Sequence, residues 1–453
     1  MKKLLVLLLF IFISLNAQTL VKEKNIAPGV KYKIYMDSEK PLYICVLEAD
    51  LTNEKLDVRV GLANDKIGAG GEGVSKYVER KSKAGEYIIG AVNGDFFGGE
   101  PFQAENNIVS NGKVLKGVSK YKRTLFGMDT EKKPLSGIFK YTGFLFRDSD
   151  TLFLNSFNFN KEPGVVLFDE HAAAVTQIDS GFVGYNLSGK DANNLVLGGK
   201  INPDTKFLID KGDYVLRVPV EEAVKFKEGD NLTLEHNFNH EKNRFDCLIG
   251  GLPYLIRDGK RPDSYIGLEG LSSEKFVDLN PRTAVGYTKS GDKLYIVAVD
   301  GRNKNVSIGI SLVDLADFMI GLGCYEAVNL DGGGSTAMTI HEKIVNAPSD
   351  ATGERPVHDF LYLAVNGNQA DYVKEFKFVN DTLLVKNGES VSPKYILFDE
   401  WGFTLHDTTI VPQYSFADGV NIEENSLKFN KVGIYSIIGT VKEAADTLTV
   451  TVK

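Results

Sequence analysis

Short apolar runs bounded by glycine, aspartate or asparagine recur along most of the chain. Runs of this length in this setting are typical of buried β-strands. We therefore expect strands over residues 43–48, 87–92, 294–299 and 361–365. Few helical patterns and no low-complexity segment interrupt these runs, which indicates one large α+β domain. We expect a large mixed β-sheet with few helices.

The clearest helical pattern covers residues 312–320, where five apolar residues fall on one face and the aspartates fall elsewhere. Ser311 is a candidate N-cap and Gly321 a stop signal for this helix. Weaker patterns predict helices over residues 74–81 and 220–226.

The pattern changes after residue 367, where short alternating runs are separated by turn signals such as Asn387-Gly388. This pattern of short runs and turns predicts a small β-sandwich over residues 368–453. The segment resembles the immunoglobulin-like modules appended to exported bacterial enzymes, and it shows no candidate chemistry.

The first 17 residues combine two lysines, an apolar run and small residues, as a secretory signal does. The run is shorter than the roughly 20 residues of a transmembrane helix, so we expect cleavage near Ala17 and a protein exported to the periplasm or the cell exterior, with no later membrane span. The net charge of −8 becomes −8 − 2 = −10 once Lys2 and Lys3 are removed. No basic stripe suggests nucleic-acid binding. The three cysteines allow one disulfide at most, and we interpret them as small buried side chains.

The strongest candidate for chemistry is the segment of residues 329–336, which reads Asn-Leu-Asp-Gly-Gly-Gly-Ser-Thr. An apolar strand here delivers the carboxylate of Asp331 to a turn in which glycines permit close approach to a ligand. Successive amides of such a turn can bind an anion. It is not a P-loop, since no lysine and no helical pattern follow. A hairpin that needs glycine for steric reasons is the alternative, but it leaves Asp331 unexplained.

Two further strand ends carry polar side chains. Asn93 and Asp95 follow one apolar run, and Asp300 and Arg302 follow another. Functional residues often lie at such loops, although Asn-Gly and Asp-Gly are also ordinary turn signals. Arg282 and Arg355 each adjoin a proline, and arginine suits a bound phosphate; a surface ion pair is the alternative for each. No HExxH or GxSxG motif is present.

Taken together and in this order, six segments resemble the phosphodiester glycosidase family. They are residues 93–97, 282–286, 299–302, 311–316, 329–336 and 354–357. The resemblance covers roughly residues 27–367, and implies a catalytic domain within residues 18–367. It further implies hydrolysis of a sugar-1-phosphodiester, of the N-acetylglucosamine-α-1-phosphate type, to free sugar and a phosphomonoester.

We expect the following roles from the resemblance and the chemistry together. Asp331 acts as nucleophile or general base, with Asp300, Asp95 or Glu354 as its partner. Phosphate is held by arginines and glycine amides, and sugar by amides and hydroxyls. The substrate-binding set is Asn93, Arg282, Thr283, Arg302, Asn329, Gly332, Gly333, Gly334, Ser335, Thr336 and Arg355.

Two other functions fit parts of the pattern. A carbohydrate-binding or envelope-associated module without turnover would use the same turns to hold a sugar, or a Ca²⁺ ion among Asp95, Asp300 and Asp331. A glycosidase of neutral glycans would explain the carboxylates but not three arginines. No cofactor is required by the first interpretation, and we assign no metal ligand in it.

Overall fold

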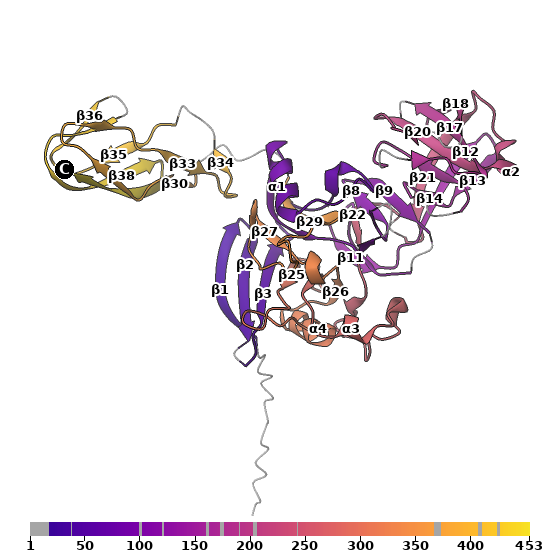
Figure 1. Ribbon diagram of the computed structural model, residues 1–453, viewed down its shortest axis with the longest axis horizontal. Coiled ribbons are helices and arrows are strands. Elements are labelled where there is room, and N and C mark those ends of the chain that lie inside the picture. Colours follow the sequence, from indigo (N-terminus) through magenta and orange to yellow (C-terminus); the bar gives the residue numbers. More distant parts are fainter. Residues whose placement is uncertain are drawn as a thin grey trace, which may run out of the picture.

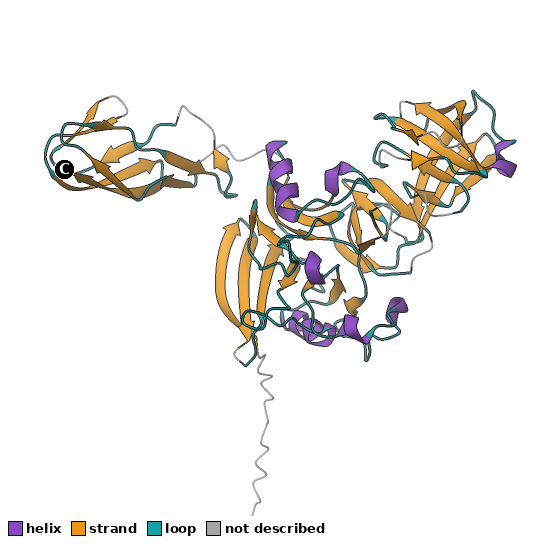
Figure 2. Ribbon diagram, in the orientation of Figure 1, coloured by secondary structure: helices purple, strands orange, loops and turns teal. Residues whose placement is uncertain are grey.

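The computed structural model describes residues 18–37, 39–98, 102–119, 122–159, 163–172, 176–189, 191–202, 206–241, 243–366, 373–405, 410–423 and 426–453. The expected signal segment and the expected domain boundary near residue 367 lie outside these ranges. The described chain consists mainly of β-strands with few helices (Figures 1 and 2). No helix within it is both long and apolar enough to cross a membrane.

Two sheets form the central part of the molecule (Figure 1). Their middle strands are buried on both faces, which explains why they read as continuous apolar runs. In sheet order, the seven-stranded sheet contains β1 (Gln18–Ala27), β2 (Val30–Asp37), β3 (Tyr43–Asp50), β25 (Lys293–Val299), β24 (Arg282–Tyr287), β26 (Glu326–Asn329) and β23 (Tyr254–Ile256). The five-stranded sheet contains β28 (Lys343–Ile344), β27 (Met338–Ile340), β5 (Ile88–Asn93), β29 (Asp359–Val365) and β4 (Leu56–Leu62).

A thirteen-stranded sheet runs from this central part into a β-rich lobe, which is magenta to pink in Figure 1. In sheet order it contains β11 (Pro134–Gly137), β10 (Leu125–Asp129), β22 (Phe245–Gly250), β8 (Ile108–Ser110), β9 (Lys113–Val118), β14 (Ser156–Phe157), β15 (Val166–Phe168), β20 (Asp213–Pro219), β17 (Phe182–Gly189), β18 (Leu195–Ile201), β21 (Asn231–Phe238), β12 (Tyr141–Arg147) and β13 (Asp150–Leu154). Only the β14–β15 pair in this sheet is parallel among the described strands. Two short pairs complete this region, β6 (Phe97–Gly98) with β7 (Gln103–Ala104) and β16 (Thr176–Gln177) with β19 (Lys206–Phe207).

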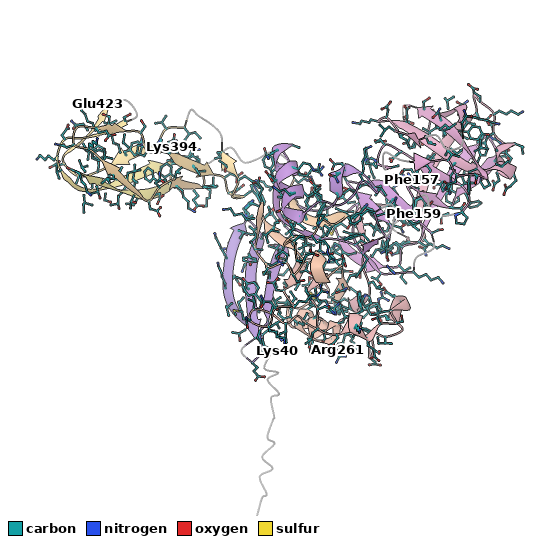
Figure 3. The ribbon with its side chains drawn as sticks, in the orientation of Figure 1. Lys40, Phe157, Phe159, Arg261, Lys394 and Glu423 are labelled. Carbon is teal, nitrogen blue, oxygen red and sulfur yellow. The ribbon has the colours of Figure 1, made fainter. Side chains whose placement is uncertain are left out.

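The lobe has a hydrophobic core of its own, which includes Leu145, Phe157 and Leu216. A different core lies under the central sheets and includes Leu47, Val92 and Leu361. The range that we expected to form one domain on one mixed sheet therefore contains separate sheets around separate cores. Figure 3 places Phe157 and Phe159 in the lobe, away from Arg261 in the central part.

The helices are short and lie on the central part or at the edge of the lobe. They are α1 (Val74–Lys83), α2 (Val220–Ala223), α3 (Glu274–Val277) and α4 (Leu312–Gly321), with single turns η1 (Ala63–Asp65), η2 (Leu268–Gly270) and η3 (Gly333–Ser335). The prediction for α4 is confirmed, including its cap: the Ser311 side chain accepts a hydrogen bond from the Asp314 amide at 3.1 Å. The third predicted helix stops at Ala223, three residues earlier than expected.

The C-terminal unit is all β and carries its own core around Phe376, Leu427 and Ile437. Its strands form sheets of three, four and three strands; the sandwich and its immunoglobulin-like character stay predictions. The strands are β30 (Glu375–Phe378), β31 (Thr382–Val385), β32 (Ser390–Val391), β33 (Tyr395–Phe398), β34 (Thr404–Leu405), β35 (Gln413–Ser415), β36 (Val420–Glu423), β37 (Ser426–Phe429), β38 (Gly433–Val441) and β39 (Ala444–Val452).

The three cysteines, Cys45, Cys247 and Cys324, are buried and form no disulfide. Burial raises the pKa of each thiol, so all three stay protonated near neutral pH. The interpretation of these residues as small core side chains is confirmed.

Candidate active site

A cavity of about 320 Å³ opens in front of the glycine-rich turn that follows β26. It combines a carboxylate, three cationic side chains and two aromatic rings. Its lining residues are Phe96, Ser273, Lys275, Phe276, Asn280, Arg282, Arg302, Asp331, Gly332 and Gly333. The sequence analysis named five of these, Arg282, Arg302, Asp331, Gly332 and Gly333.

The turn that carries Asp331 is fixed from below by a buried amide. Asn93, at the end of β5, donates from Nδ2 to the Asp331 carbonyl at 2.5 Å. Its Oδ1 accepts from the Thr283 hydroxyl at 2.7 Å and from the Ala337 amide at 3.2 Å. The Asp331 amide in turn donates to the Gly94 carbonyl at 2.9 Å. Asn93 and Thr283 therefore hold the turn in place. Their polar atoms form hydrogen bonds with each other and with the backbone.

Asp331 is half-buried at the cavity wall. One carboxylate oxygen accepts from the Gly332 amide at 2.9 Å. Burial raises the pKa of Asp331 to about 6, against the hydrogen bonds from Ser335 and Gly332 and the charge of Arg355, which lower it. A carboxylate with a pKa near 6 is ionised at neutral pH and retains a basicity suited to proton transfer.

The glycines let the turn pass close to neighbouring groups. A Cβ on Gly332 would lie 2.7 Å from the Pro281 carbonyl oxygen. One on Gly333, where φ is +62°, would lie 2.9 Å from Nη2 of Arg302. The Gly333 amide donates to the Pro281 carbonyl and the Ser335 amide to the Gly332 carbonyl. These amides are therefore engaged within the protein, and the expected anion-binding nest is not supported by them.

The arginines differ in how far they are free to bind a ligand. Arg302 is exposed, and its described hydrogen bond, to Asn280 Oδ1, is long at 3.4 Å. Arg282 is buried and donates to the carbonyls of Phe276, Asp278 and Ile310. Burial lowers the pKa of Arg282 to about 10, so it remains a fixed positive charge at the cavity wall.

Arg355 approaches the turn from its other side. Its guanidinium contacts Asp350 at 2.7 and 2.8 Å and donates to the Ser335 hydroxyl at 3.4 Å. Arg355 does not line the cavity. Its charge nevertheless lowers the pKa of Asp331, so it acts on the site through the field that it creates.

Asp300 lines a neighbouring cavity of about 370 Å³, which shares Arg302 with the first. Its carboxylate accepts from Asn346 Nδ2 at 2.9 Å and from the Ala347 amide at 3.0 Å. These bonds fix the loop of residues 346–349. Asp331, Arg282 and Arg302 therefore line one cavity, and Asp300 lines the adjoining one.

Asp95 points into the protein instead of the cavity. It is 1% exposed, and Asn106 donates to its carboxylate from both the backbone and the side chain at 2.8 to 3.1 Å. Burial, and next the charge of Asp359, raise the pKa of Asp95 well above its ordinary value. This geometry fits a structural role.

Behind the turn lie Asp359 and His358, which the sequence analysis did not select. Asp359 Oδ1 accepts from the Asp95 amide at 2.7 Å, and its charge raises the pKa of Asp331. Asp359 Oδ2 and His358 Nδ1 are buried, lie 3.8 Å apart and have no hydrogen-bond partner among the described residues. Both residues stand at the start of a wholly buried strand, and no turn signal marks them in the sequence.

The remaining candidates have structural contacts. Glu354 accepts from the amide and the hydroxyl of Ser75 at 2.8 and 2.5 Å, at the first turn of α1. Asn329 donates to the Leu252 and Leu330 carbonyls at 2.7 and 2.9 Å. Thr336 lies buried under the turn, with its hydroxyl 3.5 Å from that of Thr283. A Cβ on Gly334 would lie 2.3 Å from Arg355 Nη2, so Gly334 admits that guanidinium.

Asp95, Asp300 and Asp331 do not bring three ligand atoms together. Within the described part of the chain, the group of side chains with that spacing is Asp169, Glu170 and His171, in the β-rich lobe. The carboxylates of Asp95 and Asp300 already accept hydrogen bonds from Asn106 and Ala347. The geometry therefore does not support the calcium site that those three aspartates suggested.

Comparisons with known proteins relate this region to one enzyme family. The sequence profile described as phosphodiester glycosidase matches residues 172–364, which include Arg282, Arg302 and Asp331. N-acetylglucosamine-1-phosphodiester alpha-N-acetylglucosaminidase of Bos taurus is 32% identical over 117 residues, which are 24% of this chain and 22% of that protein. The SPbeta prophage-derived uncharacterized protein YomE of Bacillus subtilis strain 168 is 37% identical over 198 residues, or 42% of this chain and 29% of that protein. The chain thus spans less than a third of either relative.

A solved structure supports the fold. A hypothetical protein from Synechocystis has a TM-score of 0.64 with this chain at 17% identity, covering 77% of this chain and 64% of that one. This likeness concerns the arrangement of the strands alone.

Proposed function

We propose that the chain hydrolyses sugar-1-phosphodiesters in the cavity in front of Asp331, a proposal supported by the match of residues 172–364 to the phosphodiester glycosidase profile. The expected products are a free sugar, of the N-acetylglucosamine type, and a phosphomonoester. The predicted signal segment supports export as the setting of this activity.

One observation carries the proposal: a carboxylate, two exposed cations and two aromatic rings meet at a single cavity. Asp331 lies on one wall, with Arg302 and Lys275 as the exposed cations. The rings of Phe96 and Phe276 lie 5.7 Å apart between centroids. Aromatic faces suit the apolar face of a sugar ring, and the cations suit a phosphodiester.

The reaction requires one carboxylate that can act as a nucleophile or as a general base. Water adds to the anomeric carbon, the bond from that carbon to the phosphate oxygen breaks, and the phosphomonoester departs with the bonding electron pair. The departing oxygen already belongs to a phosphate anion, so little general-acid help is needed. Asp331 acts as nucleophile or general base, and Arg302 and Lys275 stabilise the negative charge that gathers on the leaving phosphate.

The test compares the full chain with variants on an N-acetylglucosamine-1-phosphodiester and on p-nitrophenyl α-N-acetylglucosaminide. We expect turnover of the phosphodiester, a loss of at least about a hundredfold in kcat for Asp331→Asn, and a raised KM for Arg302→Gln. The exposed residues Asp418 and Arg261 offer matched controls as Asp418→Asn and Arg261→Gln.

Three outcomes contradict the proposal. Sugar binding without turnover by the unmodified chain favours a carbohydrate-binding module. Preference for an uncharged glycan favours an ordinary glycosidase. Phosphodiester turnover that survives Asp331→Asn removes Asp331 from the chemistry.

A further inference from the structure

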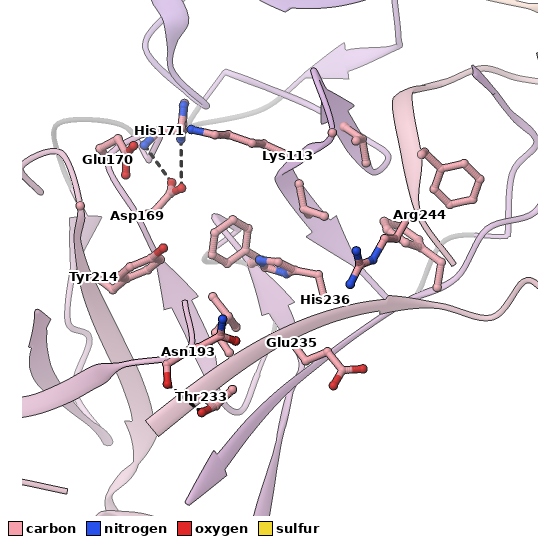
Figure 4. Close-up of a pocket in the computed structure, with 18 of the residues that line it drawn as sticks. Lys113, Asp169, Glu170, His171, Asn193, Tyr214, Thr233, Glu235, His236 and Arg244 are labelled. Carbon is pink, nitrogen blue, oxygen red and sulfur yellow. Dashed lines mark hydrogen bonds and ion pairs between the residues drawn. The ribbon is translucent and has the colours of Figure 1, made fainter. Parts of the chain in front are cut away.

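The largest opening in the β-rich lobe is a cavity of about 640 Å³, shown in Figure 4. It shares no lining residue with the cavity of Asp331. Its walls come from strands β9, β14, β20, β21 and β22 and from the loop that follows β15. Concave cavities lined by aromatic and polar side chains are frequent sites for small ligands.

Packed rings surround His236, one of the residues that line this cavity. Tyr141 of β12 lies over β9, where a Cβ on Gly117 would be 2.6 Å from its ring. The Tyr141 hydroxyl lies 3.0 Å from His236 Nδ1, and the ring of Phe157 lies 4.7 Å from that of His236, edge to face. The histidine is therefore fixed in orientation by neighbours on two sides.

His236 lines the cavity with a neutral imidazole ring. Burial lowers the pKa of His236 to about 4, so the ring is neutral at physiological pH. The Tyr141 hydroxyl shares a hydrogen bond with Nδ1, and the other ring nitrogen, Nε2, can donate or accept according to the tautomer. Nε2 has no partner among the described residues, and Figure 4 shows the ring among the side chains that line the cavity.

Two further polar groups in the wall also lack a hydrogen-bond partner among the described residues. The Tyr214 hydroxyl and the Asn193 side-chain amide line the cavity, and the described residues give neither a hydrogen-bond partner (Figure 4). Tyr214 also offers the face of an aromatic ring. Polar groups without protein partners beside an aromatic ring are suited to a ligand with both hydroxyl groups and an apolar face.

The charges around the cavity balance. The acidic lining residues are Asp169, Glu170 and Glu235, and the basic ones are Lys113, Lys211 and Arg244. A phosphate would meet the carboxylates, and a cation would meet the lysines and the arginine. This contrasts with the Asp331 cavity, where the exposed charges are positive.

A metal ion is a weaker fit. Asp169, Glu170 and His171 hold their ligand atoms within 4.8 Å of one another. However, the Asp169 carboxylate already accepts from Asn158 Nδ2 at 2.6 Å and from the His171 amide at 2.9 Å, and lies 3.0 Å from His171 Nδ1. These contacts account for the cluster without an ion.

We propose that this cavity binds a neutral carbohydrate, as a second site separate from the hydrolytic one. The aromatic wall of Tyr214 takes the apolar face of a pyranose ring, and Asn193, His236 and the rim carboxylates take its hydroxyl groups. The proposal does not depend on the reaction catalysed at Asp331.

The test is isothermal titration calorimetry of the full chain with glucose, galactose, N-acetylglucosamine, cellobiose and chitobiose, in an Asp331→Asn background that prevents turnover. We expect at least one of these sugars to bind, and Tyr214→Ala and Asn193→Ala each to weaken that binding by about tenfold, or ~1.4 kcal/mol. Phe153→Ala removes an aromatic ring of the same lobe that is 61% exposed and outside the cavity, and should leave binding unchanged.

The two sites can fail separately. In the chain with Asp331 intact, Tyr214→Ala and Asn193→Ala should retain full phosphodiester hydrolysis. Binding that persists in both variants, or the absence of binding by all five sugars, overturns the proposal. Binding of calcium, zinc or inorganic phosphate to this cavity, detected by the same titration and lost in Tyr214→Ala, overturns the assignment to carbohydrate.

Discussion

The basicity of Asp331 depends on neighbours whose charges oppose each other. Arg355 lowers its pKa, whereas burial and the Asp359 carboxylate raise it, with a result of about 6. If the ionised form is the active one, activity is half-maximal near pH 6, approaches its maximum at higher pH and is lost as the pH falls below that value. The field of a charged neighbour should therefore move the pH profile in a direction that its sign determines.

We predict that Arg355→Gln moves the acidic side of the kcat/KM profile to higher pH and that Asp359→Asn moves it to lower pH. The measurement is the initial rate on a sugar-1-phosphodiester between about pH 4 and pH 8, a window set by the ordinary and raised carboxylate pKa values. Arg261→Gln, at an exposed arginine paired with Asp317, is the matched control. Shifts of the same sign in the two variants would show that the profile reports something other than Asp331.

Among the site residues, those that lie in turns could be predicted from the sequence, and those that lie elsewhere could not. Asp331 and Arg302 follow apolar strands at glycine-rich turns, where a polar side chain is conspicuous. Lys275 lies in the four-residue helix α3, and Asp359 begins a buried strand, so neither has a local signal. Their relation to Asp331 arises from segments far apart in the chain, which no local pattern records.

The turn between β26 and β27 is the element on which the site depends. Alanine at Gly332 would place its Cβ 2.7 Å from the Pro281 carbonyl oxygen and 3.5 Å from the Arg282 Cα, both of which are backbone. Backbone atoms can move less than the end of a side chain. We therefore predict that Gly332→Ala lowers the free energy of unfolding by about 1–3 kcal/mol and lowers kcat/KM. Thermal unfolding and the phosphodiester assay measure the two effects.

Gly199→Ala is the control for that substitution, since nothing lies within 4 Å of a Cβ there. Equal losses of stability in the two variants would mean that the loss of glycine itself, and not the close approach to Pro281, explains the effect.

Substitution of Glu354 distinguishes a role in stability from a role in catalysis. Its carboxylate holds the amide and hydroxyl of Ser75 at the start of α1. We predict that Glu354→Ala costs about 1 kcal/mol of stability, as loss of a helix cap does, with kcat/KM unchanged. Chemical denaturation and the phosphodiester assay measure this, with Glu443→Ala at an exposed turn as the control. A large loss of kcat with unchanged stability would return Glu354 to the catalytic set.

The elements themselves were largely predictable. The runs expected as strands appear as β3, β5, β25 and β29, with ends that differ by one or two residues. Local alternation and capping determine such segments. Which strand pairs with which was not predictable, because β3 pairs with β25 across more than 240 residues and local patterns carry no record of that partner.

The same limit explains why the division into separate cores was not predicted from the sequence. The lobe core contains Leu145 and Leu216, and the central core contains Leu47 and Leu361. The amino-acid sequence does not show which of these leucines belongs to which core. Within the lobe, Gly117 admits the ring of Tyr141, a contact between residues 24 positions apart that the apolar pattern does not reveal.

The C-terminal unit contacts the rest of the molecule through the turn between β33 and β34, where one side chain is fully buried. Trp401 is 2% exposed and belongs to the central core, although it lies between the strands β33 and β34 of the C-terminal unit. Asp399 accepts from the amides of Trp401 and Phe403 at 2.8 and 2.9 Å, which shapes the turn. The Phe403 ring packs against Tyr87 and His341, with centroids 5.2 and 4.9 Å away.

Because the C-terminal unit also has its own core, removing the tryptophan should uncouple the two parts without unfolding the unit. Burial of such a side chain is worth about 3–5 kcal/mol. We predict that Trp401→Ala separates the calorimetric unfolding of the chain into two transitions and enlarges the radius of gyration in solution scattering. Leu384→Ala, at a side chain that is 67% exposed, should change neither quantity. A single unshifted transition in Trp401→Ala would mean that Phe403 and its ring contacts hold the unit in place without the tryptophan.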